Sequence, residues 1–309
     1  MSSEQEGSLV LPDGTKLYTK TWKPEGIAKA IIAFYHGFSD HCNSWYQFFP
    51  NLVAAGFEVH SLDQRGWGES SASDRKLRGD YGTTAVVMAD LHFFLQSLTP
   101  FTREGSIPLF LMGHSMGGMN SLYYALNPES PYHTAAQKKV QLAGVVSIAP
   151  LVMVHPTTQP LKIIEYAGRI VAKVVPKWTM VQDIDPVWVS RDEAVVEAIR
   201  KDGRLCHRTG TFEALAAMLA RGAWLDGLYK DQTAVAGVAD AVPPLLVAHG
   251  TADRITWFDA TKRMVEAVPL KDKTFKEYDG AYHKLTNDTH GVAEQFTADV
   301  VEWMNSKVV

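Results

Sequence analysis

The sequence Gly113-His114-Ser115-Met116-Gly117 contains the residue whose chemistry is easiest to predict. An apolar run comes before it and helical spacing comes after it, so Ser115 is expected at a turn from strand to helix. Glycines two places to either side let the chain turn sharply and expose the hydroxyl. The pattern predicts a nucleophilic serine, and the competing interpretation is a glycine-rich turn with an incidental serine.

A serine hydroxyl is a poor nucleophile at neutral pH, so it needs a general base, which in turn needs an acid to orient it. Asp253 lies in LLVAHGTADRIT, just beyond an expected strand, and His283 lies in EYDGAYHKLTND, after the next strand. Both positions fall at the carboxyl ends of strands, where open α/β sheets gather their sites. The alternatives are Asp259 and Asp279 for the acid, His249 and His290 for the base, and a helix-capping role for Asp253.

Acyl transfer at a serine also needs N–H donors for the oxyanion that develops on the carbonyl oxygen. One donor is expected to be the backbone N–H of Met116, at the start of the helix. The other is expected to be that of Phe38, because His36-Gly37 turns the chain after the strand that precedes it. His114, although next to the serine, is expected to point into the fold.

The elements that must position these residues alternate between strand and helix. Residues 9–24 read as a hairpin around Asp13-Gly14, and apolar runs that end in glycine or aspartate alternate with helical stretches as far as residue 150. This alternation of strands and helices stops between residues 151 and 210, where helical segments without a buried strand are expected. The alternation resumes after residue 210. We predict a mostly parallel sheet with helices on both faces, formed by 1–150 and 211–309, with 151–210 inserted as a helical cap.

Composition excludes several classes of function. The chain has 309 residues, a net charge of −4 and no strongly basic run, which gives no reason to expect nucleic acid. The start of the chain lacks the pattern of a secretory signal, and no apolar run is long enough to span a membrane. With only two cysteines, Cys42 and Cys206, a cytoplasmic, reduced protein that is not secreted is expected. Cys42 is expected to be reachable by thiol reagents.

No zinc-binding spacing and no dinucleotide fingerprint is present, so neither a metal nor a cofactor is expected. Within the expected cap, residues 161–178 place a narrow polar stripe on an otherwise apolar helix. The stripe consists of Lys162, Glu165, Arg169 and Lys173. Two interpretations of the apolar surface are open: it packs on the core as the roof of the cap, or it contacts a membrane or lipid droplet as a peripheral protein does.

Together these motifs resemble the α/β-hydrolase superfamily, and more narrowly the fungal-type monoglyceride lipases. The resemblance rests on DGTKLYTKTWKP, HGFSDH, DQRGWGES, PLFLMGHSMGG, HGTADRIT, GAYHKLTND and LARGAWL, and it extends over nearly the whole chain. It independently implies Asp253 and His283 as the acid and base. It also implies that Asp40 and His41 contact the headgroup, where Asp40 replaces a glutamate that is frequent in the family. Phe38 replaces a small residue of mammalian members and is expected to narrow the acyl path.

The resemblance implies a serine esterase that cleaves monoacylglycerol to fatty acid and glycerol through an acyl-enzyme. Because one fold supports many substrates, a lysophospholipase, a general carboxylesterase and a hydrolase acting at a peptide N-terminus remain alternatives. A non-catalytic binder on the same scaffold is the alternative from a different class. Loss of the serine, the acid or the base would have favoured a binder, and the sequence retains all three.

Overall fold

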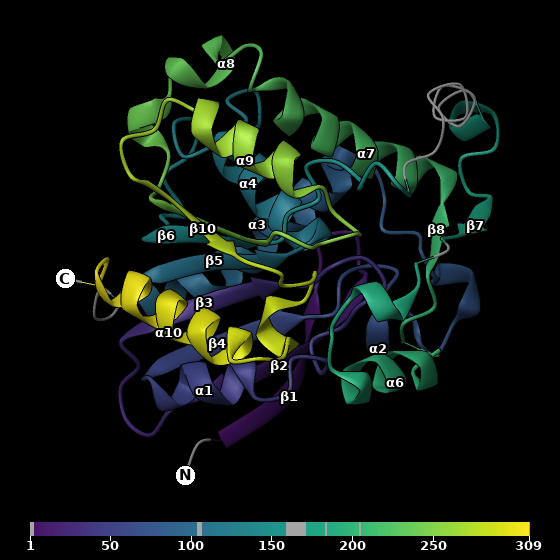
Figure 1. The fold of residues 1–309 in the computed structure, drawn as a ribbon, viewed down its shortest axis with the longest axis horizontal. Coiled ribbons are helices and arrows are strands. Elements are labelled where there is room, and N and C mark those ends of the chain that lie inside the picture. The colour runs from purple at the N-terminus through teal and green to yellow at the C-terminus, as the bar shows by residue number, and fades with distance from the viewer. Residues whose placement is uncertain (1–2, 104–106, 159–170, 183, 204, 309) are drawn as a thin grey trace.

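The computed structural model describes residues 3–103, 107–158, 171–182, 184–203 and 205–308 (Figure 1). Its centre is an eight-stranded sheet in the order β1-β2-β4-β3-β5-β6-β9-β10. The strands are β1 Ser3–Val10, β2 Lys16–Lys23, β3 Ala30–Tyr35, β4 Phe57–Leu62, β5 Leu109–His114, β6 Gly144–Ile148, β9 Leu245–Gly250 and β10 Lys273–Tyr278. The β1–β2 and β2–β4 pairs are antiparallel and the other pairs are parallel. The predicted hairpin and mostly parallel sheet are confirmed.

The central strands are continuous apolar runs because both of their faces are covered. Every residue of β3, β5, β6 and β9 is buried, whereas β1 is an exposed edge strand. Side chains alternate along β3, so Ile31 and Ala33 join one core while Ala30 and Ile32 join the other. The sheet therefore separates two hydrophobic cores.

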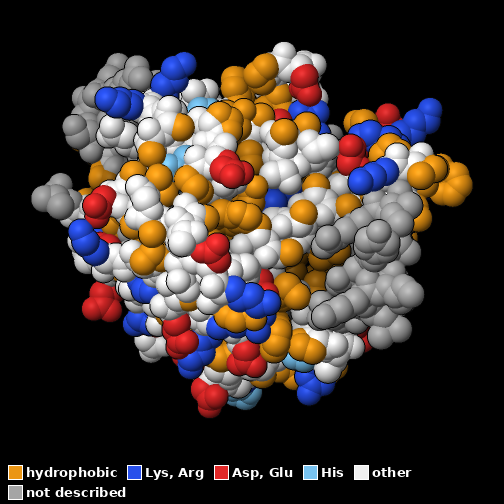
Figure 2. Space-filling view, turned by 90° about the horizontal axis from the view of Figure 1, so that it is seen from above, with side chains coloured by type: hydrophobic (Ala, Val, Ile, Leu, Met, Phe, Trp, Pro, Cys, Tyr) orange, Lys and Arg blue, Asp and Glu red, His pale blue; other side chains and the backbone are white. Residues whose placement is uncertain are grey.

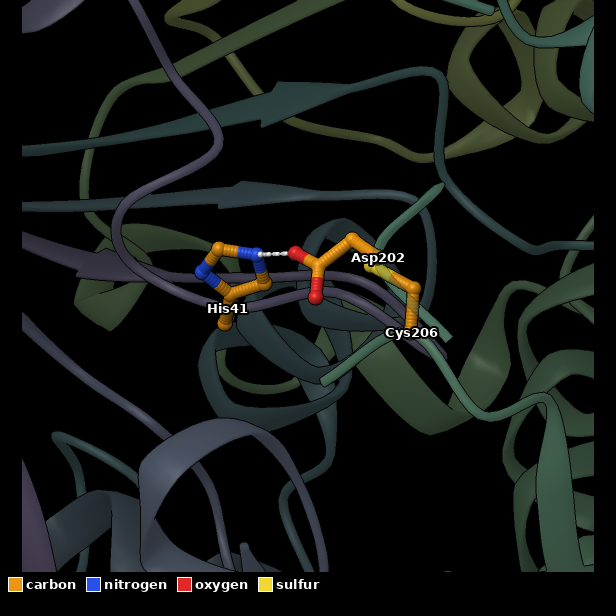
Figure 3. A group of neighbouring side chains, drawn as sticks. All are labelled: His41, Asp202 and Cys206. Atoms are coloured by element: carbon orange, nitrogen blue, oxygen red, sulfur yellow. Dashed lines mark hydrogen bonds and ion pairs between the residues drawn. The ribbon is translucent and has the colours of Figure 1, made fainter. Parts of the chain in front are cut away.

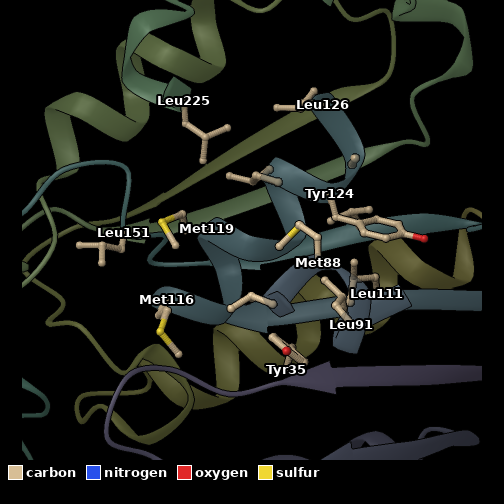
Figure 4. Close-up of a cluster of buried hydrophobic side chains, with 14 of the residues drawn as sticks. Tyr35, Met88, Leu91, Leu111, Met116, Met119, Tyr124, Leu126, Leu151 and Leu225 are labelled. Atoms are coloured by element: carbon tan, nitrogen blue, oxygen red, sulfur yellow. The ribbon is translucent and has the colours of Figure 1, made fainter. Parts of the chain in front are cut away.

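Helices cover both faces of the sheet (Figure 1). The helices are α1 Phe48–Ala54, α2 Gly68–Ser71, α3 Thr84–Arg103, α4 Met116–Leu126, α6 Glu193–Lys201, α7 Phe212–Gly227, α8 Thr233–Ala236, α9 Phe258–Ala267 and α10 Val292–Asn305. In Figure 1, α1 and α10 lie on one face, and α3, α4, α7 and α9 lie on the other. Figure 4 shows the core between the sheet and this second group of helices. Met88 of α3, Met119 of α4 and Leu225 of α7 belong to it.

The segment between β6 and α7 departs in part from the prediction. Its described residues add no strand to the central sheet, and α6 is helical, as expected. A two-stranded ribbon was not predicted: β7 Thr179–Val181 pairs with β8 Thr209–Thr211. Three-residue strands are too short to show an alternating pattern. The division at residue 210 stays a prediction and falls within β8. Of the predicted polar stripe, Lys162, Glu165 and Arg169 lie outside the described residues, and Lys173 is exposed.

Candidate active site

Ser115 sits at the sharp turn between β5 and α4. Its backbone has φ 55° and ψ −116°, a conformation that is strained for a residue with a side chain. The chain passes close to β3 at this turn: a Cβ atom added to Gly117 would lie 1.9 Å from the carbonyl oxygen of Tyr35, the last residue of β3. A Cβ on Gly113 would lie 2.3 Å from the carbonyl oxygen of Gly117. Both glycines are therefore required by the backbone.

Asp253 and His283 form a buried hydrogen-bonded pair. Nδ1 of His283 lies 2.7 Å from Oδ2 of Asp253, and the two residues come from the loops after β9 and β10. The aspartate also accepts the backbone N–H groups of Ile255 at 2.7 Å and Thr256 at 2.9 Å. Burial alone would raise the pKa of Asp253, but the charge of His283 and the side-chain hydrogen bonds from His249 and His283 outweigh burial and lower it. The carboxylate therefore stays ionised and orients the imidazole.

His249 and His114 both contact the pair formed by Asp253 and His283. Nε2 of His249 donates to Oδ2 of Asp253 at 3.1 Å. The sequence did not predict this second imidazole donor to the carboxylate. His114 is buried, as predicted, and its Nε2 donates to the carbonyl oxygen of His283 at 3.2 Å. Of His249 and His283, only His283 lines the cavity that contains Ser115.

The rival acids occupy the positions expected for them. Asp259 lies in the first turn of α9 and accepts from the indole N–H of Trp257 at 3.2 Å. Asp279 lies in the turn after β10 and accepts from Oγ1 of Thr251 at 3.2 Å. Asp253 is the one of the three that contacts His283.

The loop after β3 that is predicted to supply an oxyanion donor is held in place by His36; residues 36–44 are called the oxyanion loop. The backbone N–H of Gln64 donates to Nε2 of His36 at 2.9 Å, so the ring proton is on Nδ1, which donates to the carbonyl oxygen of Gly37 at 2.7 Å. That carbonyl belongs to the same peptide plane as the N–H of Phe38, which points the opposite way. Met116 is the first residue of α4, where backbone N–H groups have no intrahelical acceptor.

Ser115, His283 and Phe38 line one cavity of about 430 Å³. The ring of Phe38 packs against Trp67, with ring centroids 4.7 Å apart, and so fills space beside the cavity. Volumes of this order are typical of sites for small ligands.

A buried charged pair lies at the polar side of the cavity. Nζ of Lys284 lies 3.4 Å from Oδ2 of Asp40, donates to Oγ of Ser44 at 3.0 Å and sits 4.2 Å from the ring centre of Trp45. Lys284 is 3% exposed and Asp40 is 8% exposed. Burial opposes ionisation of Asp40, but Lys284 and His41 outweigh burial and hold the pKa of this carboxyl well below its usual range. Lys284 was missed because nothing in the sequence indicates that a lysine after the histidine turns inward.

Nε2 of His41 lies 2.8 Å from Oδ2 of Asp202, and Cys206 lies beside them (Figure 3). These three residues are close enough together to share a metal ion. However, the backbone N–H of Asn43 donates to Nδ1 of His41, so the ring proton is on Nε2 and faces Asp202. Burial also raises the pKa of the Cys206 thiol. The group fits a hydrogen bond that ties α6 to the oxyanion loop better than a metal site.

The expectation that Cys42 is reachable by reagents is wrong. Its side chain is 0% exposed, and it belongs to the core between the sheet and α1. Burial also raises the pKa of the Cys42 thiol. Cys206, rather than Cys42, is the cysteine that lines the cavity.

Comparison with known proteins places this geometry in a family. Residues 26–290 match the family described as serine aminopeptidase, S33. A Schizosaccharomyces pombe protein named "Putative monoglyceride lipase" is 32% identical, with 93% of this chain and 71% of the relative covered. The monoglyceride lipase of Homo sapiens is 28% identical, with 97% of this chain and 90% of the relative covered.

The fold comparison agrees with the sequence comparison. A soluble variant of monoglyceride lipase from Saccharomyces cerevisiae, solved with a substrate analog, superposes with a TM-score of 0.84 at 24% identity. The superposition covers 99% of this chain and 95% of that one, which shows a shared α/β-hydrolase fold. The protein therefore belongs to the serine aminopeptidase S33 family of α/β-hydrolases and is a relative of the monoglyceride lipases.

Proposed function

We propose that this protein is a serine esterase that hydrolyses monoacylglycerol to a free fatty acid and glycerol. The observation that carries the proposal is the common cavity of Ser115 and His283, together with the buried Asp253, which lies 2.7 Å from Nδ1 of the histidine. The substrate class comes from the relatives named monoglyceride lipase in Schizosaccharomyces pombe and Homo sapiens. The lysophospholipase and the general carboxylesterase use the same residues and differ only in substrate.

In the proposed reaction, Nε2 of His283 accepts the proton of Ser115 while Oγ bonds to the ester carbonyl carbon. The carbonyl oxygen becomes an oxyanion, which the N–H groups of Phe38 and Met116 stabilise. Collapse of this intermediate breaks the ester bond, and His283 donates its proton to the departing glycerol oxygen. Water then attacks the acyl-enzyme with His283 as the base, and the fatty acid leaves as Ser115 regains its proton.

Asp253 remains ionised throughout this cycle. Its carboxylate holds Nδ1–H of His283, so Nε2 faces the cavity as the proton acceptor, and it stabilises the imidazolium that forms. The lowered pKa of Asp253 supports this role, because protonation would remove the negative charge that favours the imidazolium.

The walls of the cavity suit an amphiphilic ester. The apolar wall comes mainly from the segment around α6, and the polar wall comes from the oxyanion loop and Lys284. The apolar lining residues are Ile184, Pro186, Val189, Ala198 and Ile199, and the polar ones include Ser39, Asp40, His41, Asn43 and Ser44. A single acyl chain fits the first wall, and the hydroxyls of glycerol fit the second.

The cavity is less suited to a free peptide N-terminus, despite the aminopeptidase description of the family. An α-ammonium group needs an uncompensated carboxylate. The two carboxylates that line the cavity are engaged already, Asp40 by Lys284 and Asp202 by His41. The charges therefore favour a neutral polar headgroup.

We also propose that the segment around β7 contacts a lipid surface. Four apolar side chains of this segment are 45–75% exposed: Val174, Trp178, Met180 and Val181. Neighbouring exposed apolar side chains often mark a site of contact with a partner or a membrane. On the side where Figure 1 places β7, Figure 2 shows hydrophobic side chains at the outer edge beside lysine or arginine. No helix among the described residues is long and apolar enough to cross a bilayer. The proposed contact is therefore peripheral, with a membrane or a lipid droplet.

A substrate panel tests the proposal. The monoacylglycerol, diacylglycerol, triacylglycerol and lysophospholipid of one chain length are compared with an aminoacyl amide, each with wild type and Ser115→Ala. We expect the highest kcat/KM for monoacylglycerol and no turnover by the variant. A higher kcat/KM for any other substrate would contradict the assignment, and hydrolysis of none would favour the non-catalytic binder.

A further inference from the structure

Arg221 of α7 is a buried guanidinium group with no carboxylate partner among the described residues. It is 1% exposed. Its Nε donates to Oδ1 of Asn120 at 2.9 Å, and its Nη1 donates to Oγ1 of Thr84 at 3.0 Å. Its Nη2 atom is buried and has no hydrogen-bond partner in the part of the chain that the structure describes.

Asn120 of α4 meets the Nε edge of Arg221 with a neutral amide and not with a carboxylate. Nε and Nη2 form the fork of a guanidinium that binds both oxygens of a carboxylate, as Nε and Nη2 of Arg65 do with Asp90. At Arg221 the group that meets Nε is an amide, which offers one oxygen and one NH₂ group. Nδ2 of Asn120 is also buried, and no described residue accepts a hydrogen bond from it.

Two buried donors of this hydrogen-bonded pair, Nη2 of Arg221 and Nδ2 of Asn120, therefore lack an acceptor among the described residues. Reversing the amide would not remove the problem, because the donor Nδ2 would then lie about 2.9 Å from Nε, which is also a donor. Either orientation leaves buried N–H groups unpaired, which is costly in a protein interior. The arrangement calls for an acceptor that the described residues do not supply.

The missing acceptor also has to balance a charge. The groups whose charges act on Arg221 are Tyr81, Tyr35 and Tyr123, which are neutral at physiological pH, and burial lowers the pKa of the arginine. A guanidinium stays protonated even so, and an uncompensated buried charge is strongly unfavourable. A water molecule could accept two hydrogen bonds but would leave the charge unbalanced.

We propose that Arg221 and Asn120 form an internal binding site for a small inorganic anion, of which chloride is the simplest. The anion accepts from Nη2 of Arg221 and Nδ2 of Asn120 and neutralises the guanidinium. Because Asn120 is 0% exposed and Arg221 is 1% exposed, the site admits a single-atom anion in preference to a carboxylate metabolite. The anion links α7 to α4, the helix that begins after Ser115.

Bromide in place of chloride gives a direct test by anomalous diffraction from crystals of the full chain. The expected result is an anomalous peak beside Nη2 of Arg221 and Nδ2 of Asn120. In solution, the Tm of wild type should rise as chloride replaces gluconate at constant ionic strength, because a ligand bound only by the folded state stabilises it.

Asn120→Asp is the matched control. Its carboxylate would fill the fork of Arg221 and supply the negative charge, so the Tm of this variant should not respond to chloride. At low chloride its Tm should also exceed that of wild type. The proposal is overturned if bromide gives no peak at the site, or if the Tm of wild type and of Asn120→Asp responds equally to chloride.

Discussion

At the scale of single residues, the sequence was most informative where chemistry requires a fixed order along the chain. Ser115, Asp253 and His283 were found because each follows a strand and because a serine needs a base and an acid. The structure brings His283 and Asp253 together as predicted. It also adds Lys284, which the sequence did not single out, and it places His249, considered as a base, as a second donor to Asp253. Their roles depend on partners such as Asp40, which is 244 positions from Lys284.

Replacement of Lys284 by methionine should destabilise the protein. The change leaves the carboxylate of Asp40 buried without its cation, and loss of one member of a buried pair costs about 3–5 kcal/mol. The free energy of unfolding, measured in urea, should fall by an amount of this order. The double variant Asp40→Asn with Lys284→Met removes both charges and should recover part of the loss. Equal instability of the single and double variants would show that the ion pair is not the cause.

Cys42 should resist modification in the folded protein. Burial excludes reagents, and the raised pKa of the thiol keeps the reactive thiolate scarce. Mass spectrometry after treatment with a maleimide should find Cys42 unmodified in buffer and modified in urea. Rapid modification of Cys42 in buffer would contradict the burial described above.

At the scale of elements, strands and helices were predictable where long apolar runs repeat, and short or irregular pieces were not. The central strands and α4 appear where expected, because burial on two faces leaves a plain signal in the sequence. The β7–β8 ribbon was missed because only backbone pairing over three residues on each side defines it, from Thr179 opposite Thr211 to Val181 opposite Thr209. The turn at Ser115 is the element on which the proposed chemistry depends most.

Gly117→Ala should disrupt this turn. The new Cβ would overlap the carbonyl oxygen of Tyr35, and backbone at the centre of the sheet cannot move aside without breaking its pairing. We expect a loss of Tm together with at least a tenfold loss of esterase activity, since small displacements of catalytic groups cost about 100-fold.

Gly227→Ala is the matched control for this prediction, because a Cβ at the end of α7 meets no atom within 4 Å. Thermal unfolding and ester hydrolysis should both be close to those of wild type. A Gly117→Ala protein as stable and active as Gly227→Ala would contradict the packing described for the turn.

At the scale of the whole molecule, the site lies at the carboxyl ends of the parallel strands, between the sheet and the segment that contains α6. The motifs at strand ends predicted this location, but they could not predict the walls of the cavity. Those walls come from residues 184–203 and 205–208 and from the oxyanion loop, which are far apart in the sequence and meet only after folding. The exposed apolar residues near β7 also lie between β6 and α7.

Trp178→Ser should weaken binding to lipid surfaces without impairing the chemistry. Trp178 is 68% exposed and does not line the cavity. In a flotation assay with phosphatidylcholine vesicles, the bound fraction should fall, while hydrolysis of a water-soluble short-chain ester stays unchanged. Ile27→Ser, at a residue that is 90% exposed between β2 and β3, is the control and should bind vesicles as wild type does. Equal binding by all three proteins would contradict the proposed contact.

The central claim is that Ser115 is a nucleophile activated by His283 and Asp253. A fluorophosphonate probe, followed by mass spectrometry of the labelled peptide, measures this most directly. Wild type should be labelled at Ser115, and Ser115→Ala should not be labelled. His283→Ala should be labelled more slowly by several orders of magnitude, since removal of one member of such a triad costs about 10⁴–10⁶-fold. Failure of wild type to label, or equal labelling of wild type and Ser115→Ala, would contradict the claim.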